Sequence, residues 1–217
     1  MKIDKTWIII PLLIILVISI SGCITDDLFK KGETFDSNVI TFQYPDSWQI
    51  VNCVSEGSLG AVASKSDSNI SVVVQQVPAD YGNNPQEACS KNNINLVQSP
   101  NYINVQESKT TVNGREVIVH RYLVNEADGS QKEHVATWMK MDDDKLYVLL
   151  FSTPVSSYES QRSSYDLIVG TFAIKNGTTK TTSNNGNNAN NSGSTSTSSD
   201  GSIIGIITDQ VNKFFSG

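Results

Sequence analysis

The sequence has few of the residues that build metal clusters and thiol enzymes. Its 217 residues include only three cysteines and two histidines. Positive charge is also scarce, because 16 Lys and Arg stand against 22 Asp and Glu, which gives a net charge of -6. A chain of this charge has no basic surface to neutralise phosphates, so the composition argues against nucleic-acid binding. We expect no bound metal and no cofactor.

Motifs of common catalytic and nucleotide-binding sites are missing as well. The sequence contains no GxSxG elbow, no HExxH, no P-loop and no GxGxxG. The run Asp142 to Asp144 offers carboxylates to Ca²⁺, but it lacks the spacing, the glycine and the distant Glu of an EF-hand. We therefore expect these acids to form a solvated hairpin turn.

The N-terminus indicates export and membrane attachment. Lys2 and Lys5 precede an apolar run over 7–20, which as a helix would rise about 21 Å, less than the roughly 30 Å of a bilayer core. A short apolar run behind positive charge is typical of a secretory signal peptide. It ends in Ile-Ser-Gly-Cys over 20–23, which resembles the lipobox of prokaryotic lipoproteins. The resemblance implies cleavage before Cys23 and a lipid on its thiol.

The alternative is an uncleaved anchor that spans the membrane once. Under both interpretations residues 1–22 are a signal peptide or anchor and residues 23–32 a linker. Both also place the rest of the chain outside the cytoplasm, attached to the cell membrane. Membrane lipid is therefore the first partner that the sequence predicts.

Two further cysteines, Cys53 and Cys89, form an even pair in a compartment that permits disulfides. We expect a bridge between them, which would stabilise the fold by roughly 3 to 4 kcal/mol. The alternative is a pair of buried free thiols, because cysteine is among the most frequently buried residue types.

The composition changes abruptly after Lys175. Residues 176–202 consist almost entirely of Asn, Ser, Thr and Gly, so they cannot bury a core and are predicted to be a disordered linker. Residues 203–217 are predicted to form a short amphipathic helix. We expect it to contact a membrane, a partner or its own domain. Its apolar residues, which recur at helical spacing, are Ile203, Ile204, Ile207, Val211, Phe214 and Phe215.

Residues 33–175 are expected to form one α+β domain. The pair Asn113-Gly114 is a strong signal for a two-residue hairpin turn, and Asp128-Gly129 and Asp142 to Asp144 mark two more turns. These turns divide 105–153 into a four-strand antiparallel meander. Three shorter strands are predicted upstream, at 39–44, 59–65 and 70–77.

Two helices are predicted to cover the sheet. The first begins at Asn84-Pro85, which supplies a cap followed by a proline at the first helical position. The second follows Ser156, and Glu159 three residues later completes a capping box.

Residues 40–48, Ile-Thr-Phe-Gln-Tyr-Pro-Asp-Ser-Trp, resemble the opening of PsbP-like domains, in which an amphipathic strand runs into Tyr-Pro-x-x-Trp. The order of the predicted elements is similar to that family too. The resemblance implies a central antiparallel sheet with packed helices, and relatives that act mainly as binding or assembly modules outside the membrane. It implies little chemistry, because a fold alone does not determine function.

Glu107 and His120 are the polar pair that the strand pattern brings together. Counting through the Asn-Gly turn places Glu107 opposite His120, and counting through a loop at 126–129 places His134 opposite Arg121, on the other face of the sheet. A Glu–His pair can supply a base and its orienting group. A half-exposed contact within the sheet is the simpler interpretation.

Two functions therefore remain. The first is a membrane-tethered extracytoplasmic module that binds or assembles with an envelope protein or a small ligand and has no catalytic site. The alternative is an extracytoplasmic hydrolase with a site near His120. A deep polar cleft containing His120 would favour the hydrolase, whereas a shallow apolar groove would favour a partner surface.

Overall fold

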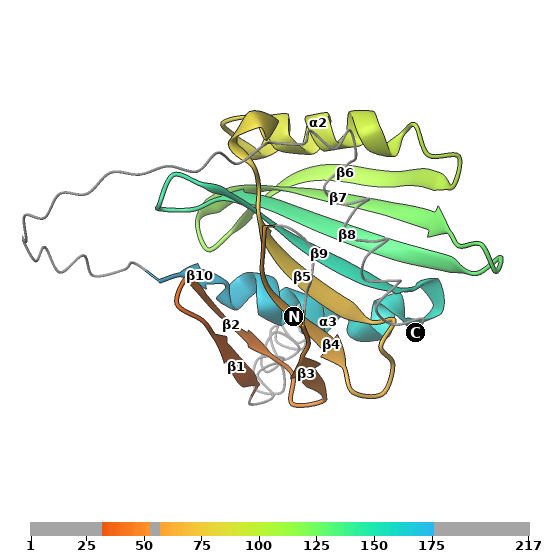
Figure 1. The fold of residues 1–217 in the computed structure, drawn as a ribbon, viewed down its shortest axis with the longest axis horizontal. Coiled ribbons are helices and arrows are strands. Elements are labelled where there is room, and N and C mark those ends of the chain that lie inside the picture. The colour runs from red at the N-terminus through yellow and green to blue at the C-terminus, as the bar shows by residue number, and fades with distance from the viewer. Residues whose placement is uncertain (1–31, 53–56, 176–217) are drawn as a thin grey trace, which may run out of the picture. The chain divides into compact units, whose positions relative to one another are not determined.

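The computed structural model describes residues 32–52 and 57–175 of the chain. These residues form strands, two α-helices and two short 3-10 helices (Figure 1). The strands are β1 (Glu33–Asp36), β2 (Ile40–Tyr44), β3 (Trp48–Ile50), β4 (Ser58–Ser64), β5 (Ser71–Gln76), β6 (Tyr102–Val112), β7 (Arg115–Asn125), β8 (Gln131–Lys140), β9 (Leu146–Pro154) and β10 (Ala173–Ile174). The helices are η1 (Ala79–Tyr81), α2 (Pro85–Leu96), η2 (Val155–Ser157) and α3 (Tyr158–Thr171).

Seven strands form the main sheet, in the order β3-β4-β5-β9-β8-β7-β6. Every neighbouring pair is antiparallel. Strands β6 to β9 lie side by side in chain order, so the predicted meander is confirmed (Figure 1). The predicted strand at 39–44 belongs elsewhere, because β2 pairs with β1 and β10 in a separate three-stranded sheet.

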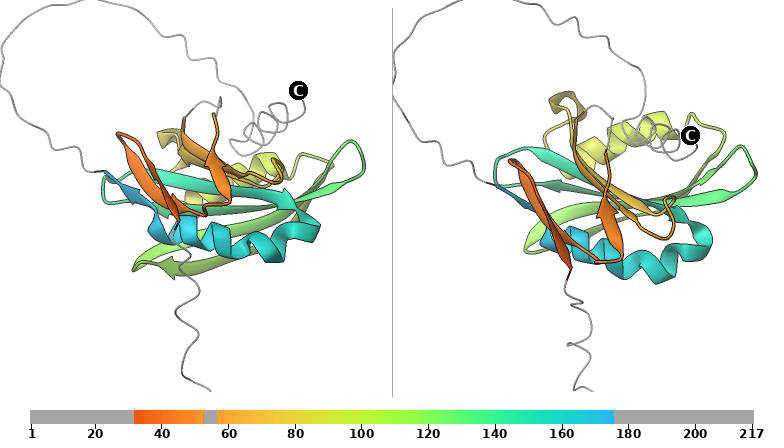
Figure 2. Two further views of the ribbon diagram at one scale, coloured as in Figure 1. Left: turned by 90° about the horizontal axis from the view of Figure 1, so that it is seen from below. Right: turned by 60° about the horizontal axis from the view of Figure 1, so that its bottom comes forward.

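Each face of the main sheet carries its own apolar core, and the two helices lie on opposite faces (Figure 2). On the face of α3, Phe151 and Ile168 pack with Phe42 and Trp48, two aromatic residues of the segment at 40–48. On the face of α2, Trp138 and Leu150 pack against Ala88 and Cys89 of the helix. The central strands β8 and β9 are therefore buried on both sides.

The two helices begin differently. α2 starts at its predicted cap, where the Asn84 side chain accepts a hydrogen bond from the Glu87 backbone N–H at 2.9 Å. The capping box predicted for α3 is absent, because η2 precedes the helix and its N-cap, Ser157, makes no side-chain cap bond. The buried residues of α3 are Tyr158, Tyr165, Ile168 and Val169, and Phe172 directly after the helix is buried as well.

The two hairpin turns fix the strand register. Asn113 and Gly114 have φ angles of 51° and 77°, which is the left-handed pair that a two-residue primed turn requires. Between β7 and β8 the loop is one residue longer than predicted, because Asp128 accepts a hydrogen bond from the backbone of Ser130 at 2.8 Å and Gly129 adopts φ 83°.

This extra residue moves His134 to the other face of the sheet. His134 pairs with Tyr122 and not, as predicted, with Arg121. A shift of one residue reverses every side chain in a strand. The prediction that His120 and His134 lie on opposite faces is therefore wrong.

Three predicted segments lie outside the described residues: the signal or anchor at 1–22, the linker at 176–202 and the amphipathic helix at 203–217. In the part of the chain that the structure describes, no helix has the length and apolar character needed to cross a membrane.

Candidate functional site

Glu107 lies between the main sheet and α2. It pairs with His120 in the β6–β7 ladder, as the sequence predicts. Its carboxylate accepts hydrogen bonds from three side chains of α2: the Gln86 amide at 2.8 Å, the Asn93 amide at 3.1 Å and the Cys89 thiol at 3.6 Å. Glu107 thus fixes the helix to the edge of the sheet.

His120 bonds to a different set of groups. Its Nε2 lies 3.0 Å from the Tyr102 hydroxyl and 3.3 Å from Oδ1 of Asn104, both on β6. Its side chain is fully buried, and its Nδ1 has no hydrogen-bond partner among the described residues. No described hydrogen bond joins it to Glu107, so the two residues are neighbours without forming an acid–base pair.

The electrostatics of this cluster oppose nucleophilic chemistry. Burial raises the pKa of the Cys89 thiol, and the negative charge of Glu107 raises it further. The thiolate is the nucleophilic form of cysteine, so Cys89 stays protonated and unreactive. Burial also lowers the pKa of His120, an effect that Glu107 partly offsets.

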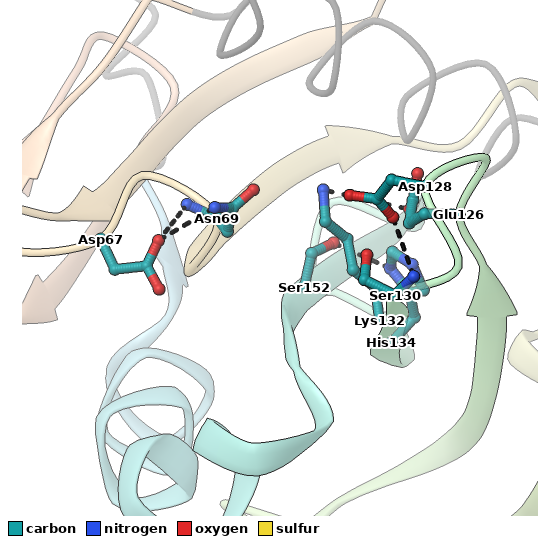
Figure 3. A network of polar contacts seen from close by, with 8 residues as sticks. All are labelled: Asp67, Asn69, Glu126, Asp128, Ser130, Lys132, His134 and Ser152. Carbon is teal, nitrogen blue, oxygen red and sulfur yellow. Dashed lines mark hydrogen bonds and ion pairs between the residues drawn. The ribbon is translucent and has the colours of Figure 1, made fainter.

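A row of rings continues from His120 across the sheet. Tyr122 lies with its ring centroid 5.0 Å from that of His120 and 5.0 Å from that of His134. The row ends at β9, where Nδ1 of His134 lies 2.9 Å from the Ser152 hydroxyl; the two side chains point toward each other in Figure 3. Complete burial, and secondarily the charge of Lys132, lowers the pKa of His134 to about 3. The ring is therefore neutral at physiological pH and acts as a packed core residue.

The structure tests the predicted cysteine sites only in part. Cys89 is a free, buried thiol, so the disulfide is not present here, and Cys53 lies outside the described residues. The predicted bridge stays a prediction. The lipidation residue Cys23 and the contact residues at 203–217 also lie outside the described residues.

The acidic run at the β8–β9 turn is held by neighbouring groups. Asp142 pairs with Arg115, Asp144 lies 2.8 Å from Lys140, and Asp143 accepts a hydrogen bond from the Tyr147 hydroxyl at 2.7 Å. Over 32–52 and 57–175, no group of three or more His, Cys, Asp or Glu side chains is placed to hold a metal ion.

A groove of about 210 Å³ opens on the other face of the main sheet, beside the first turns of α3. Strands β6, β7 and β8 and helix α3 supply its lining, and His120 is not part of it. Two of its lining residues are apolar and the other five carry polar groups. Its residues are Gln106, Ser108, Val119, Arg121, Val135, Tyr158 and Arg162.

Arg121 is held in a fixed position at the centre of this groove. Its Nε donates to the carboxylate of Glu133, which is only 2% exposed, and its guanidinium lies 4.3 Å from the centre of the Tyr158 ring. The hydrogen bond to Glu133 raises the pKa of Arg121, so its charge is permanent. The buried ion pair and the aromatic contact both restrict the side chain.

The groove did not emerge from the sequence. Its strand residues Val119 and Arg121 alternate as the β7 pattern predicts, but Tyr158 and Arg162 belong to a helix that packs there from far along the chain. One sequence feature that points to the groove is the rarity of arginine. The chain has three arginines, Arg115, Arg121 and Arg162.

Comparisons with known proteins agree with this fold. The family model described as PsbP matches residues 33–174. The solution structure of cyanobacterial PsbP (CyanoP) from Synechocystis sp. PCC 6803 is similar with a TM-score of 0.50 and 14% identity, over 72% of this chain and 99% of that one. No match was found among curated protein sequences.

Two further solved structures are similar at lower scores. LpqN, involved in cell envelope biogenesis of Mycobacterium tuberculosis, has a TM-score of 0.48 and 13% identity over 68% of this chain and 87% of its own. The Saccharomyces cerevisiae Ran-binding protein Mog1p has a TM-score of 0.46 and 12% identity over 66% of this chain and 96% of its own. At these identities the comparisons describe the fold and not the activity.

Proposed function

Because the chain belongs to the PsbP family, whose model matches residues 33–174, we propose that it is a membrane-tethered binding or assembly module outside the cytoplasm. Its partner would be an envelope protein or a small ligand. This assignment agrees with a family whose members act mainly as binding or assembly modules. The fold by itself would not decide the point.

One observation carries the proposal: the buried residues with catalytic potential, Cys89 and His120, lie on one face of the main sheet, whereas the groove opens on the opposite face. The exposed Glu107 bonds to α2 and His120 bonds to β6, and neither these two residues nor Cys89 line that groove. A hydrolase needs a nucleophile or an activated water in contact with substrate. The cluster instead has a protonated thiol and a buried imidazole.

The face that carries the groove is suited to contact a partner. Strand β6 is one of the two edge strands of the main sheet, and most of its residues are exposed. Ile103 and Val105 on this strand are exposed apolar side chains, at 42% and 43%. Exposed apolar residues next to a groove are a frequent feature of interaction surfaces.

Site-specific photo-crosslinking in native membranes tests the binding surface. A benzophenone amino acid at Thr110, which is exposed and on the groove side of β6, should form a defined adduct. The matched control is the same amino acid at Ser90, exposed on α2 across the sheet. An adduct from Thr110 alone supports the proposal, and identical adducts or none from both positions contradict it.

The hydrolase is tested in the same preparation. We expect full-length protein to hydrolyse neither ester nor phosphoester test substrates above background. Hydrolysis that is lost in His120→Gln, while the fold by circular dichroism is retained, would overturn the proposal in favour of the alternative.

The tether is tested separately. If the Ile-Ser-Gly-Cys sequence over 20–23 is a lipobox, mass spectrometry of the mature protein should find a lipidated Cys23 at its N-terminus. Cys23→Ala should abolish the lipid mass. An intact Met1 in membrane-extracted protein would contradict lipidation and leave the uncleaved anchor.

A further inference from the structure

We infer that the groove beside α3 is a binding site for a singly charged carboxylate on a small apolar group. The inference rests on the proposed binding function and names the ligand class of that surface. Its starting point is the distribution of arginine: two of the protein's three arginines, Arg121 and Arg162, line this one groove, and no acidic residue lines it. This occurs in a chain whose net charge is -6.

The polar residues that line the groove can all donate hydrogen bonds to a carboxylate. The described contacts of Arg121 engage its Nε with Glu133 and its face with Tyr158. Its terminal nitrogens, which form one side of the guanidinium fork, are the groups left to line the groove. Arg162, the Ser108 hydroxyl and the Gln106 amide add further donors around the rim. Arginine binds carboxylates through two parallel hydrogen bonds, which lysine cannot reproduce.

The neighbouring charges favour a monoanion over a phosphate dianion. Glu133 already neutralises Arg121 from the buried side. Arg162 lies 3.9 Å from Asp166, but both side chains are more than 60% exposed, at 61% and 66%, so solvent screens this pair and Arg162 is able to turn toward a ligand. Glu159 also acts on Arg121 from the first turn of α3. The site therefore offers little net positive charge, and we expect weak, salt-sensitive binding.

The size and floor of the groove define the rest of the ligand. A volume of about 210 Å³ is below the roughly 300 to 1,000 Å³ of sites for drug-sized molecules. Val119 and Val135 supply the apolar lining, and Tyr158 adds an aromatic ring. A single amino-acid side chain with its carboxylate fits this description, such as the C-terminal residue of a peptide or a free amphiphilic acid.

The experiment is a titration of valine-methyl-labelled full-length protein in lipid nanodiscs, followed by NMR. The probes are N-acetyl-leucine, its uncharged amide N-acetyl-leucinamide, and inorganic phosphate. We expect N-acetyl-leucine to shift the Val119 and Val135 methyl signals saturably, with a dissociation constant of about 1 to 10 mM for a ligand of this size. The amide and phosphate should each bind at least about fivefold more weakly.

Two single-arginine variants distinguish binding in the groove from a general effect of protein charge, and a double variant tests Arg121. Arg162→Gln should weaken N-acetyl-leucine about fivefold, since Arg162 is exposed and its loss leaves the core intact. Arg115→Gln removes the same charge at a site paired with Asp142, outside the groove, and should leave the dissociation constant unchanged. The double variant Arg121→Gln/Glu133→Gln removes the central fork together with its buried partner and should abolish the methyl shifts.

Several results would overturn the inference. These are equal binding of acid and amide, phosphate binding as tightly as the acid, equal effects of Arg162→Gln and Arg115→Gln, or no shift at the two methyls. If these results appear while Thr110 still crosslinks to a partner, the carboxylate assignment fails and the binding function stands. If the crosslink is lost as well, both fail. If a dipeptide with a free C-terminus binds as tightly as N-acetyl-leucine, the carboxylate comes from a peptide end. If a longer free acid binds more tightly than N-acetyl-leucine, it comes from an amphiphile.

Discussion

Glu107 lies directly opposite His120 across the β6–β7 ladder, yet the two side chains bond in different directions. Glu107 bonds to Gln86, Cys89 and Asn93 of α2. His120, on β7, bonds to Tyr102 and Asn104 of β6. A pair that resembles a base and its orienting group is therefore a structural connection between the helix and the sheet.

The first prediction tests this structural role. Glu107→Gln replaces a carboxylate that accepts three hydrogen bonds with an amide, which has one acceptor oxygen where the carboxylate has two. We expect the free energy of unfolding to fall by about 1 to 3 kcal/mol, measured by urea denaturation. Glu116→Gln is the matched control, because Glu116 pairs only at the surface with Lys109, and its effect should stay within about 0.5 kcal/mol. Equal effects of the two variants would contradict the role of Glu107.

The second prediction concerns pH. Burial lowers the pKa of His134 to about 3, so this ring stays neutral in the folded protein at pH values where the unfolded chain takes up a proton; burial shifts the pKa of His120 in the same direction. The contribution of the buried neutral imidazole to the free energy of unfolding is thus complete above the unfolded pKa of about 6.5, and it is lost as the pH falls below that value. Between pH 7.5 and 5, the free energy of unfolding should decrease with a limiting slope of about 1.4 kcal/mol per pH unit from His134, and His120 adds to the decrease with the same sign.

Urea midpoints across this pH range measure the effect. His134→Gln retains a hydrogen-bond acceptor for Ser152 but cannot take up a proton. The dependence of the unfolding free energy on pH should therefore lose the contribution of one proton. An unchanged slope in this variant would show that His134 does not carry the pH dependence. The carboxylates with lowered pKa values, Asp128 and Asp142, are charged throughout this range and contribute little to the slope.

The part of the fold that the sequence predicted correctly is the part governed by local signals. The Asn113-Gly114 turn determines its own strand register, and the opposition of Glu107 and His120 followed from it. The β7–β8 loop has the equally clear signal Asp128-Gly129, but a side-chain bond from Asp128 extends the loop by one residue. Sequence spacing does not reveal that bond, so the face of His134 was assigned incorrectly.

The groove could not be predicted because it depends on contacts between distant segments. Val119 and Arg121 are on β7, whereas Tyr158 and Arg162 are on α3. Their meeting requires α3 to pack over one face of the sheet, which no local pattern specifies. The separate sheet of β1, β2 and β10 was missed for the same reason, since β10 is two residues long and follows α3.

The third prediction decides the state of the cysteines. Native protein should resist alkylation at Cys89 under both interpretations, because the thiol is buried. Unfolding in urea without a reductant distinguishes them: the predicted disulfide keeps Cys53 and Cys89 unlabelled, whereas free thiols react at once. The free Cys89 thiol of the structure predicts labelling in urea alone. Protection until a reductant is added would instead establish the bridge, and Cys53→Ser should then cost about 2 to 5 kcal/mol of stability. Labelling of both cysteines in urea alone would rule the bridge out.

The last prediction concerns the division of the chain. Residues 33–175 contain the aromatic anchors Trp48, Trp138 and Phe151, which are fully or almost fully buried, whereas 176–202 contain no aromatic or branched aliphatic residue. A segment without such residues cannot bury a core. Limited proteolysis should therefore cut within 176–202 and leave a fragment with the same cooperative unfolding.

Deletion of 203–217 then assigns a role to the terminal segment. If unfolding is unchanged but association with a partner or membrane is lost, the apolar residues from Ile203 to Phe215 carry that contact. If the deletion lowers the free energy of unfolding instead, the segment packs on its own domain, because the loss of buried apolar side chains from a folded unit is destabilising. If neither changes, the contact belongs to the sheet, and the Thr110 crosslink should persist in the deleted chain.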